Sequence, residues 1–197
     1  MKDNKYAAEL FAHIGRLTNG HKYPGGLTAA QWMTVRYFAT ANRMSRTVSA
    51  FAEFHAVTRG TASQTIKSLV EQGYLSRVVS KQDGRSNVIN LTRKGQKLRR
   101  DDPIFDLEKV LQDLPIKLRK NLVKTLERIV GEVASLREQN GFGKCPNCKC
   151  LDQIGDVEEG IVSYQCTFMN AALTDSELDQ ICINFQPALR SGLDAKN

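Results

Sequence analysis

The sequence predicts a mainly helical α+β chain with one small β-hairpin and a short cysteine-rich C-terminal extension. Three observations lead to this fold class. Apolar residues recur at three- and four-residue steps through much of residues 1–140, which is the period of an amphipathic helix. Residues 74–92 instead contain two strand-like runs around an Asp-Gly turn. All five cysteines lie within residues 141–197, which are therefore expected to form a separate extension.

Size and charge restrict the possible functions. The 197 residues are enough for one domain and an appendage, and 41% hydrophobic content supports a core. Residues 1–140 carry a net charge of +11 and residues 141–197 one of −4, so the first part is expected to bind a polyanion. No apolar run reaches membrane-spanning length, and residues 1–6 lack the apolar core of a secretory signal. We therefore expect a cytoplasmic protein with no membrane partner.

Two helices are predicted before residue 40. The first carries an apolar stripe of Tyr6, Leu10, Ile14 and Leu17, and Pro24 with two following glycines ends this pattern. Thr28 is the expected N-cap of the second helix. Because Gln31 follows three residues later, the two side chains can form a capping box.

A helix-turn-helix arrangement is predicted next. A third helix begins at Thr47 or Ser49, and a fourth covers residues 61–72 with Gly73 at its C-terminal cap. The outer side of the fourth helix carries polar side chains that can reach base edges or phosphates: Arg59, Thr61, Ser63, Gln64 and Lys67. The alternative is an ordinary solvated helix face.

The hairpin that follows is typical of a DNA-binding wing. "YLSRVVS" and "NVINLT" read as strands, and "KQDGRS" supplies the turn. Arg85 at the tip can enter a minor groove while Asp83 or the turn backbone holds its guanidinium. Lys81 at the tip and Arg77 on the first strand complete the expected DNA-binding set. The alternative is an exposed hairpin with incidental charges.

Residues from about 5 to 140 resemble a winged-helix regulator of the MarR (multiple antibiotic resistance regulator) family. The resemblance rests on "LTAAQWMTV", "VTRGTASQTIKSLVEQGYLSR" and "DGRSNVINLTRKGQKL". It implies a winged helix-turn-helix domain and a homodimer that binds an inverted-repeat operator in double-stranded DNA, usually as a repressor. Some members bind an aromatic ligand between the dimerisation region and the winged helix, which leaves a small-molecule ligand open here.

A dimer is also predicted from the residues themselves. A helix of some 24 residues, "IKLRKNLVKTLERIVGEVASLREQ", is too apolar along one side for a small monomer to cover. We expect this helix and the first one to form the dimer interface. The alternative is that the apolar side packs within its own chain. Its members are Leu118, Leu122, Leu126, Ile129, Val133 and Leu136.

The cysteines point to a metal-binding extension. Cys145 and Cys148 form a CxxC knuckle, and Cys150 follows at once. Cys166 comes after a short strand, "GIVSYQ", and Cys182 is expected on an amphipathic helix, "LTDSELDQICINF", with a Thr174–Glu177 capping box.

Three interpretations of these thiols stay open. An iron–sulfur cluster accepts irregular cysteine spacing and is slightly favoured, a zinc site would use four thiolates, and metal-free thiols could act as a redox switch. The expected ligands are Cys145, Cys148, Cys166 and Cys182, or Cys150 in place of one of them.

The leading hypothesis is a dimeric transcriptional regulator, a repressor by the resemblance, whose extension senses redox state or metal supply. The alternative is a DNA-binding adaptor with a structural zinc tail for protein interaction. We expect no enzyme, because His13, His21 and His55 are scattered and no Cys-His pairing, phosphate loop or carboxylate dyad is evident.

Overall fold

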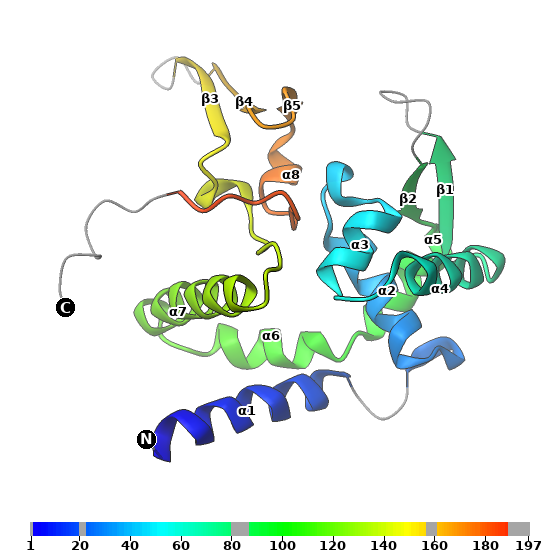
Figure 1. Ribbon diagram of the computed structural model, residues 1–197, viewed down its shortest axis with the longest axis horizontal. Helices are drawn as coiled ribbons and strands as arrows, with labels where there is room; N and C mark the ends of the chain where they lie inside the picture. The colour runs from blue at the N-terminus through cyan, green and yellow to red at the C-terminus, as the bar shows by residue number, and fades with distance from the viewer. Residues whose placement is uncertain (1, 20–22, 80–86, 157–160, 189–197) are drawn as a thin grey trace.

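The computed structural model describes residues 2–19, 23–79, 87–156 and 161–188, and it is mainly helical with a small hairpin, as predicted (Figure 1). Its elements fall into two successive regions of the chain. The first contains α1 (Lys2–Asn19), α2 (Ala29–Thr40), α3 (Val48–Phe54), α4 (Arg59–Glu71), β1 (Leu75–Val79), β2 (Asn87–Leu91), α5 (Arg93–Leu98), α6 (Ile104–Gln112) and α7 (Ile116–Leu136). The second contains β3 (Leu151–Asp156), β4 (Ile161–Cys166), β5 (Ala171–Leu173) and α8 (Asp175–Leu178).

Side-chain caps fix where α2, α3 and α4 begin. The predicted capping box between Thr28 and Gln31 is present, and Thr47 caps α3. The fourth helix begins two residues earlier than predicted, because the Thr58 side chain accepts a hydrogen bond from the amide of Thr61. Arg59 therefore lies inside α4. After α4, Gly73 has φ +76°, a left-handed conformation that favours glycine and lets the chain turn into β1.

The core of the first region lies between α2, α3, α4 and the hairpin. Trp32 and Phe38 of α2, Ile66 and Leu69 of α4 and Ile89 of β2 are almost completely buried. Each such side chain contributes about 1.5–3 kcal/mol to folding. This packing holds α4 and the hairpin in a fixed relation.

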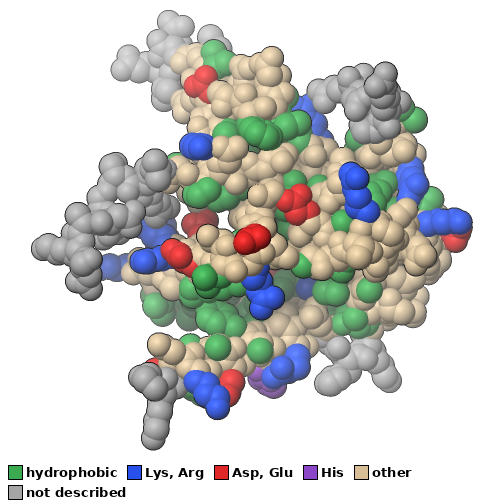
Figure 2. Space-filling model, viewed as in Figure 1, with side chains coloured by type: hydrophobic (Ala, Val, Ile, Leu, Met, Phe, Trp, Pro, Cys, Tyr) green, Lys and Arg blue, Asp and Glu red, His purple; other side chains and the backbone are tan. Residues whose placement is uncertain are grey.

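In Figure 1 α7 lies to the left of this core, and α6 and α1 lie to its lower left. No residue of α6 or α7 is buried within the single chain, and hydrophobic side chains gather over these two helices in Figure 2. The predicted long helix is shorter at its C-terminal end than 24 residues: it ends at Leu136, and Glu138 has a positive φ of +53°. No helix among the described residues is long and apolar enough to cross a membrane.

The C-terminal extension has a three-stranded antiparallel sheet in the order β3-β4-β5. The strand before Cys166 and the Thr174–Glu177 capping box are as predicted. The prediction that Cys182 lies on the same helix is wrong, because α8 ends at Leu178. Residues 181–182 instead form isolated bridges, Ile181 with Ala41 and Cys182 with Gly143. These backbone partners hold the segment in an extended conformation.

Candidate DNA interface and thiol pocket

The predicted reading residues lie on α4, with different exposure. Thr61, Gln64 and Lys67 are exposed, whereas Ser63 is half-buried at the flank of the helix. Lys67 lies 3.9 Å from Glu71, an exposed pair that contributes little and leaves the ammonium free to meet phosphate. Thr61, Gln64 and Lys67 can therefore contact one DNA groove together.

Arg59 and Thr61 also make contacts that position α4. The Arg59 Nε donates to the Ser49 hydroxyl of α3 at 3.0 Å, which links the two helices of the motif. The Thr61 hydroxyl lies 2.9 Å from that of the N-cap residue Thr58. Both polar groups are satisfied locally, so DNA contact would compete with these bonds.

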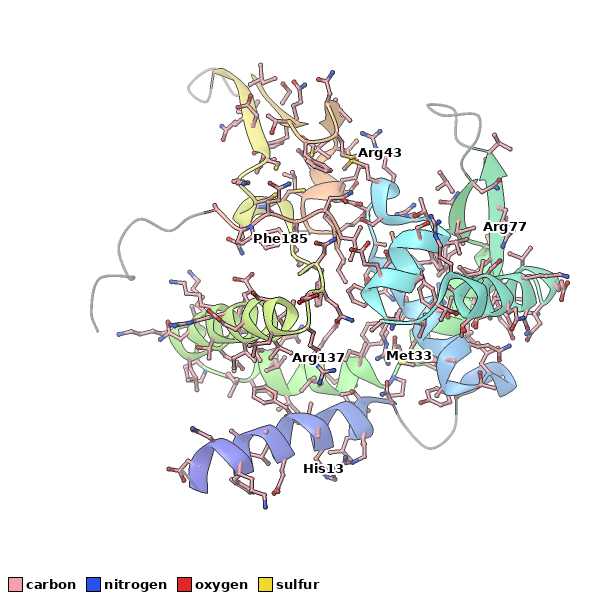
Figure 3. The ribbon with its side chains drawn as sticks, viewed as in Figure 1. His13, Met33, Arg43, Arg77, Arg137 and Phe185 are labelled. Atoms are coloured by element: carbon pink, nitrogen blue, oxygen red, sulfur yellow. The ribbon has the colours of Figure 1, made fainter. Side chains whose placement is uncertain are left out.

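The hairpin projects beside α4, with β1 and β2 paired from Leu75–Leu91 to Val79–Asn87 (Figure 1). Arg77 on β1 is exposed, and its position is labelled in Figure 3. The predicted tip residues Lys81, Asp83 and Arg85 lie outside the described residues.

Lys94, just after the hairpin, has a role that the sequence did not predict. Its Nζ donates to the Gln72 carbonyl at 2.8 Å and lies 4.3 Å from the centre of the Tyr74 ring. Lys94 thereby satisfies a carbonyl at the C-terminal end of α4 and holds that end against the base of the hairpin.

All five cysteines line one pocket in the extension, and all are free thiols. The knuckle follows from local hydrogen bonds: the Cys148 amide donates to the Cys145 carbonyl at 2.9 Å, and the Gln186 amide donates to Cys148 Sγ at 3.5 Å. The remaining lining residues are mostly apolar: Met44, Leu151, Leu173, Asn184 and Phe185.

The other cysteines reach the pocket from the sheet and from the extended segment. Cys166 pairs with Leu151 across β3 and β4, and the Thr167 amide donates to the Cys150 carbonyl at 2.9 Å. Cys182 is placed by two backbone hydrogen bonds with Gly143. A side chain at Gly143 would not fit, because a Cβ there would lie 2.8 Å from the Phe185 ring.

Burial disfavours the charged form of these thiols. Burial, followed by the neighbouring thiols of Cys182, Cys148 and Cys166, raises the pKa of Cys145 to about 11. Burial and the adjacent Cys148 thiol also raise the pKa of Cys150. At neutral pH Cys145 is therefore protonated, and a metal ion would have to displace its proton.

The donor chemistry fits a soft metal centre, because the pocket is lined by cysteine sulfurs in mostly apolar surroundings and, as far as the structure describes the chain, by no carboxylate. The thiols are not positioned as the ligands of a metal ion, however. Within the described part of the chain, no three His, Cys, Asp or Glu side chains are grouped so that they could hold a metal ion. Metal binding would therefore have to draw at least three sulfur atoms closer together.

Sequence reasoning did not find the residues that join this pocket to the rest of the chain. Met44, from the connection between α2 and α3, lines the pocket, and Arg43 contacts the extension (Figure 3). One signal was present in "ICINF", where Ile181 and Ile183 alternate with Cys182 as in an extended segment.

These elements define a winged helix-turn-helix domain with an appended thiol pocket. Residues 25–86 match the model of the MarR family. The chain resembles a MarR transcriptional regulator from Methanosarcina mazei Go1, with 21% identity, a TM-score of 0.52 and coverage of 69% of this chain and 99% of that one. It also resembles FabT of Streptococcus pneumoniae, solved in complex with DNA, with 22% identity, a TM-score of 0.52 and coverage of 68% and 97%.

A third similar structure is a mutant of MepR from a multidrug-resistant S. aureus clinical isolate, with 21% identity, a TM-score of 0.51 and coverage of 66% and 96%. No curated protein sequence matches the chain. The structural matches cover about two thirds of this chain, so the fold of the first region is that of MarR-type winged helices.

Proposed function

We propose that this protein is a dimeric, sequence-specific DNA-binding transcriptional regulator of the MarR type, acting as a repressor. Its C-terminal thiol pocket would bind an iron–sulfur cluster or zinc and so sense redox state or metal supply. The observation that carries the DNA-binding part is the exposed polar face of α4, held against a hairpin inside the segment that matches the MarR family model. The net charge of +11 in residues 1–140 favours a polyanion as partner.

A dimer is supported by the apolar side of α7, which one chain leaves in water. Leu118 and Val133 are each about half exposed and Leu136 is 84% exposed, although apolar surface of this kind is usually covered in soluble proteins. A second copy would place two α4 helices for successive major grooves of an inverted-repeat operator, about 34 Å apart.

The sensing part rests on the convergence of all five thiols on one apolar pocket. Soft thiolate ligands favour iron–sulfur clusters and zinc over magnesium or calcium. Cys145, Cys148, Cys166 and Cys182, the four-thiol set expected from the sequence, all line this pocket. Cys150 lines it too, so it is the candidate to replace one member.

A second candidate is a DNA-binding adaptor in which the same four thiols hold a structural zinc ion and nothing is sensed. It is favoured by the extensive contacts between the extension and its own winged helix, which are those of a structural module. Zinc in this role would stabilise the extension without changing DNA affinity.

The test begins with protein purified without oxygen, its ultraviolet–visible spectrum, and its iron, sulfide and zinc content. A duplex enriched from a random library by the protein then serves for affinity measurements with and without the metal. Visible absorption with iron and sulfide, together with a metal-dependent DNA affinity, supports the cluster-based sensor. Zinc with unchanged DNA affinity supports the adaptor. Protein with no bound metal after purification and after anaerobic reconstitution rejects both metal proposals, and failure to enrich any duplex rejects sequence-specific binding.

A further inference from the structure

The extension contacts the connection between α2 and α3, defined here as residues Thr40–Thr47. Ile181 forms an isolated backbone bridge with this connection: its amide donates to the Thr40 carbonyl at 2.8 Å, and the Asn42 amide donates to the Ile181 carbonyl at 2.9 Å. Ala41, between these two bonds, is completely buried. The contact is therefore a backbone-paired junction that shields the connection from water.

A buried hydrogen bond strengthens this junction. The Ile183 amide donates to the Ser45 hydroxyl at 3.1 Å, and both residues are buried. Ser45 is itself fixed, because its amide donates to Asn42 Oδ1 at 2.9 Å and its carbonyl accepts from the Tyr37 hydroxyl at 2.7 Å. A buried amide that loses its acceptor is costly, so Ile183 and Ser45 are expected to move together.

An ion pair adds a third contact. Arg43 Nε lies 3.0 Å from Glu177 Oε1, close enough for ion pairing although the N–H is not aligned as a hydrogen bond. The Arg43 guanidinium also donates to the Ala172 carbonyl of β5. Glu177 is held in turn by the Thr174 amide, which donates to its Oε2 at 2.9 Å. In Figure 3 Arg43 lies between the connection and the extension.

The opposite side of the same connection holds the hairpin. The Ile89 amide of β2 donates to the Arg46 carbonyl at 2.8 Å, and the Arg46 guanidinium donates to Asn90 Oδ1 at 3.2 Å and to the Ala41 carbonyl at 2.9 Å. Thr47, the next residue, caps α3. The connection is thus bonded to the extension on one side and to the wing and α3 on the other.

Cys182 lies between the two anchoring residues Ile181 and Ile183, and Met44 of the connection lines the thiol pocket. A movement of the Cys182 sulfur toward a metal that exceeds a side-chain rotation would therefore shift or strain one or both anchors. Packed elements respond to such changes by moving between discrete arrangements rather than by deforming smoothly.

We propose that the state of the thiol pocket is transmitted to the wing and α3 of the same chain through the connection Thr40–Thr47. This inference rests on the proposed metal-binding function and names the route by which that site would regulate DNA binding. The competing route runs through α7, where the Asn147 amide group donates to Glu127 Oε1 at 2.7 Å. Among the described residues it is the one side-chain hydrogen bond between the extension and α7, and it is exposed, whereas the contacts with the connection are several and largely buried.

The experiment compares full-length wild type with Arg43→Met, Ser45→Ala and the matched control Glu127→Ala. Each protein is prepared with the metal found after anaerobic purification and again after its removal by a chelator. The measured quantity is the ratio of the two Kd values for the enriched duplex. A coupling of ordinary size gives a ratio of about 5 to 150 for wild type.

We expect Arg43→Met and Ser45→Ala to bring this ratio toward one while metal content stays at the wild-type level, and Glu127→Ala to keep the wild-type ratio. If wild type binds no metal or shows no change in Kd, the proposed sensing function fails. If wild type responds and both connection variants respond equally, or if Glu127→Ala alone loses the response, the inference fails and the sensing function stands.

A measurement on wild type alone covers the case in which the variants lose metal or fold poorly. Hydrogen–deuterium exchange is followed in peptides covering residues 40–47 and 87–91, with a peptide from α6 as reference. We expect metal removal to raise deuterium uptake in the first two peptides and not in the third. Unchanged uptake in both would overturn the inference independently of any variant.

Discussion

Arg36 of α2 and Asp102 form an ion pair in which Arg36 Nε donates to Asp102 Oδ2 at 2.9 Å and the Asp102 side chain is 1% exposed. The same guanidinium donates to the Thr18 carbonyl near the end of α1, and Asp102 Oδ1 accepts from the Ile104 amide at the start of α6. One charged pair therefore joins the α1 and α6 helices to the core of the winged helix.

Asp102→Ala should lower the free energy of unfolding by about 3 kcal/mol, because it leaves the Arg36 charge without its partner in a largely buried position. Asp106→Ala is the matched control, since Asp106 pairs with Lys109 at 3.5 Å on the surface and its loss should cost under about 1 kcal/mol. Urea unfolding of both variants gives the comparison. Equal losses of unfolding free energy in the two variants would show that the buried ion pair contributes no more to stability than the exposed one.

Gln64→Ala and Lys67→Ala should affect DNA binding differently. The Gln64 side chain can pair with an adenine edge, so its loss should relax sequence preference at one position by about 1–3 kcal/mol. The Lys67 ammonium suits a phosphate, so its loss should weaken binding to all duplexes and reduce the salt slope by about one. Anisotropy titrations against the enriched duplex and single-base variants measure both. If both substitutions lower the affinity for all duplexes by the same factor, the residues that contact the bases are assigned incorrectly.

Val133→Lys should convert the protein to monomers. Val133 is 48% exposed in one chain, so a lysine there costs the folded monomer little but places a charge in the proposed interface. Lys124→Ala, on the same helix at an exposed position, is the control. Light scattering with sedimentation gives the mass of each, and a fully dimeric Val133→Lys protein would place the interface elsewhere.

His55 should make stability depend on pH. Its imidazole packs between Phe51 and Phe54, at ring distances of 4.6 and 5.0 Å, and burial lowers its pKa from 6.5 to about 4. Between pH 4 and pH 6.5 the unfolded chain binds a proton at His55 more readily than the folded chain does. The stability contributed by the buried neutral imidazole is therefore complete above about pH 6.5 and is lost as the pH falls toward 4.

His55→Gln should therefore reduce the loss of stability between pH 7 and pH 5 by about 1 kcal/mol, a figure discounted for the partial exposure of the ring. His13→Gln is the control, because His13 is exposed on α1. The measurement is urea unfolding at both pH values. The same pH dependence in His55→Gln as in wild type would contradict the assignment.

Serine replacement of single cysteines should separate the ligands. Cys145→Ser, Cys148→Ser and Cys166→Ser should each abolish metal retention, whereas Cys150 and Cys182 compete for the remaining position. Metal analysis and circular dichroism measure the effects. Full metal content in all five single-cysteine variants would show that these thiols do not form the metal site. We expect the helical core before residue 137 to remain folded, because its buried residues contain no cysteine.

Local patterns in the sequence determined most of the winged-helix region. Capping by Thr28 and Thr47, the glycine turn at Gly73 and the two strand-like runs of the hairpin depend on a few neighbouring residues, so they could be predicted without tertiary information. The start of α4 was placed two residues late, because Thr58 and Thr61 are both plausible caps and the side chain that bonds the backbone decides between them.

The tertiary structure alone decided how the two regions meet. The predicted helix over "LTDSELDQICINF" follows from local periodicity, but Thr40, Asn42 and Gly143 offer backbone partners that hold residues 181–182 extended. Those partners are far away in the chain, beyond any local periodicity. The sequence by itself therefore determined the winged helix and the grouping of thiols in the extension, whereas long-range backbone pairing decided that the thiol pocket lies against the connection that also carries the wing.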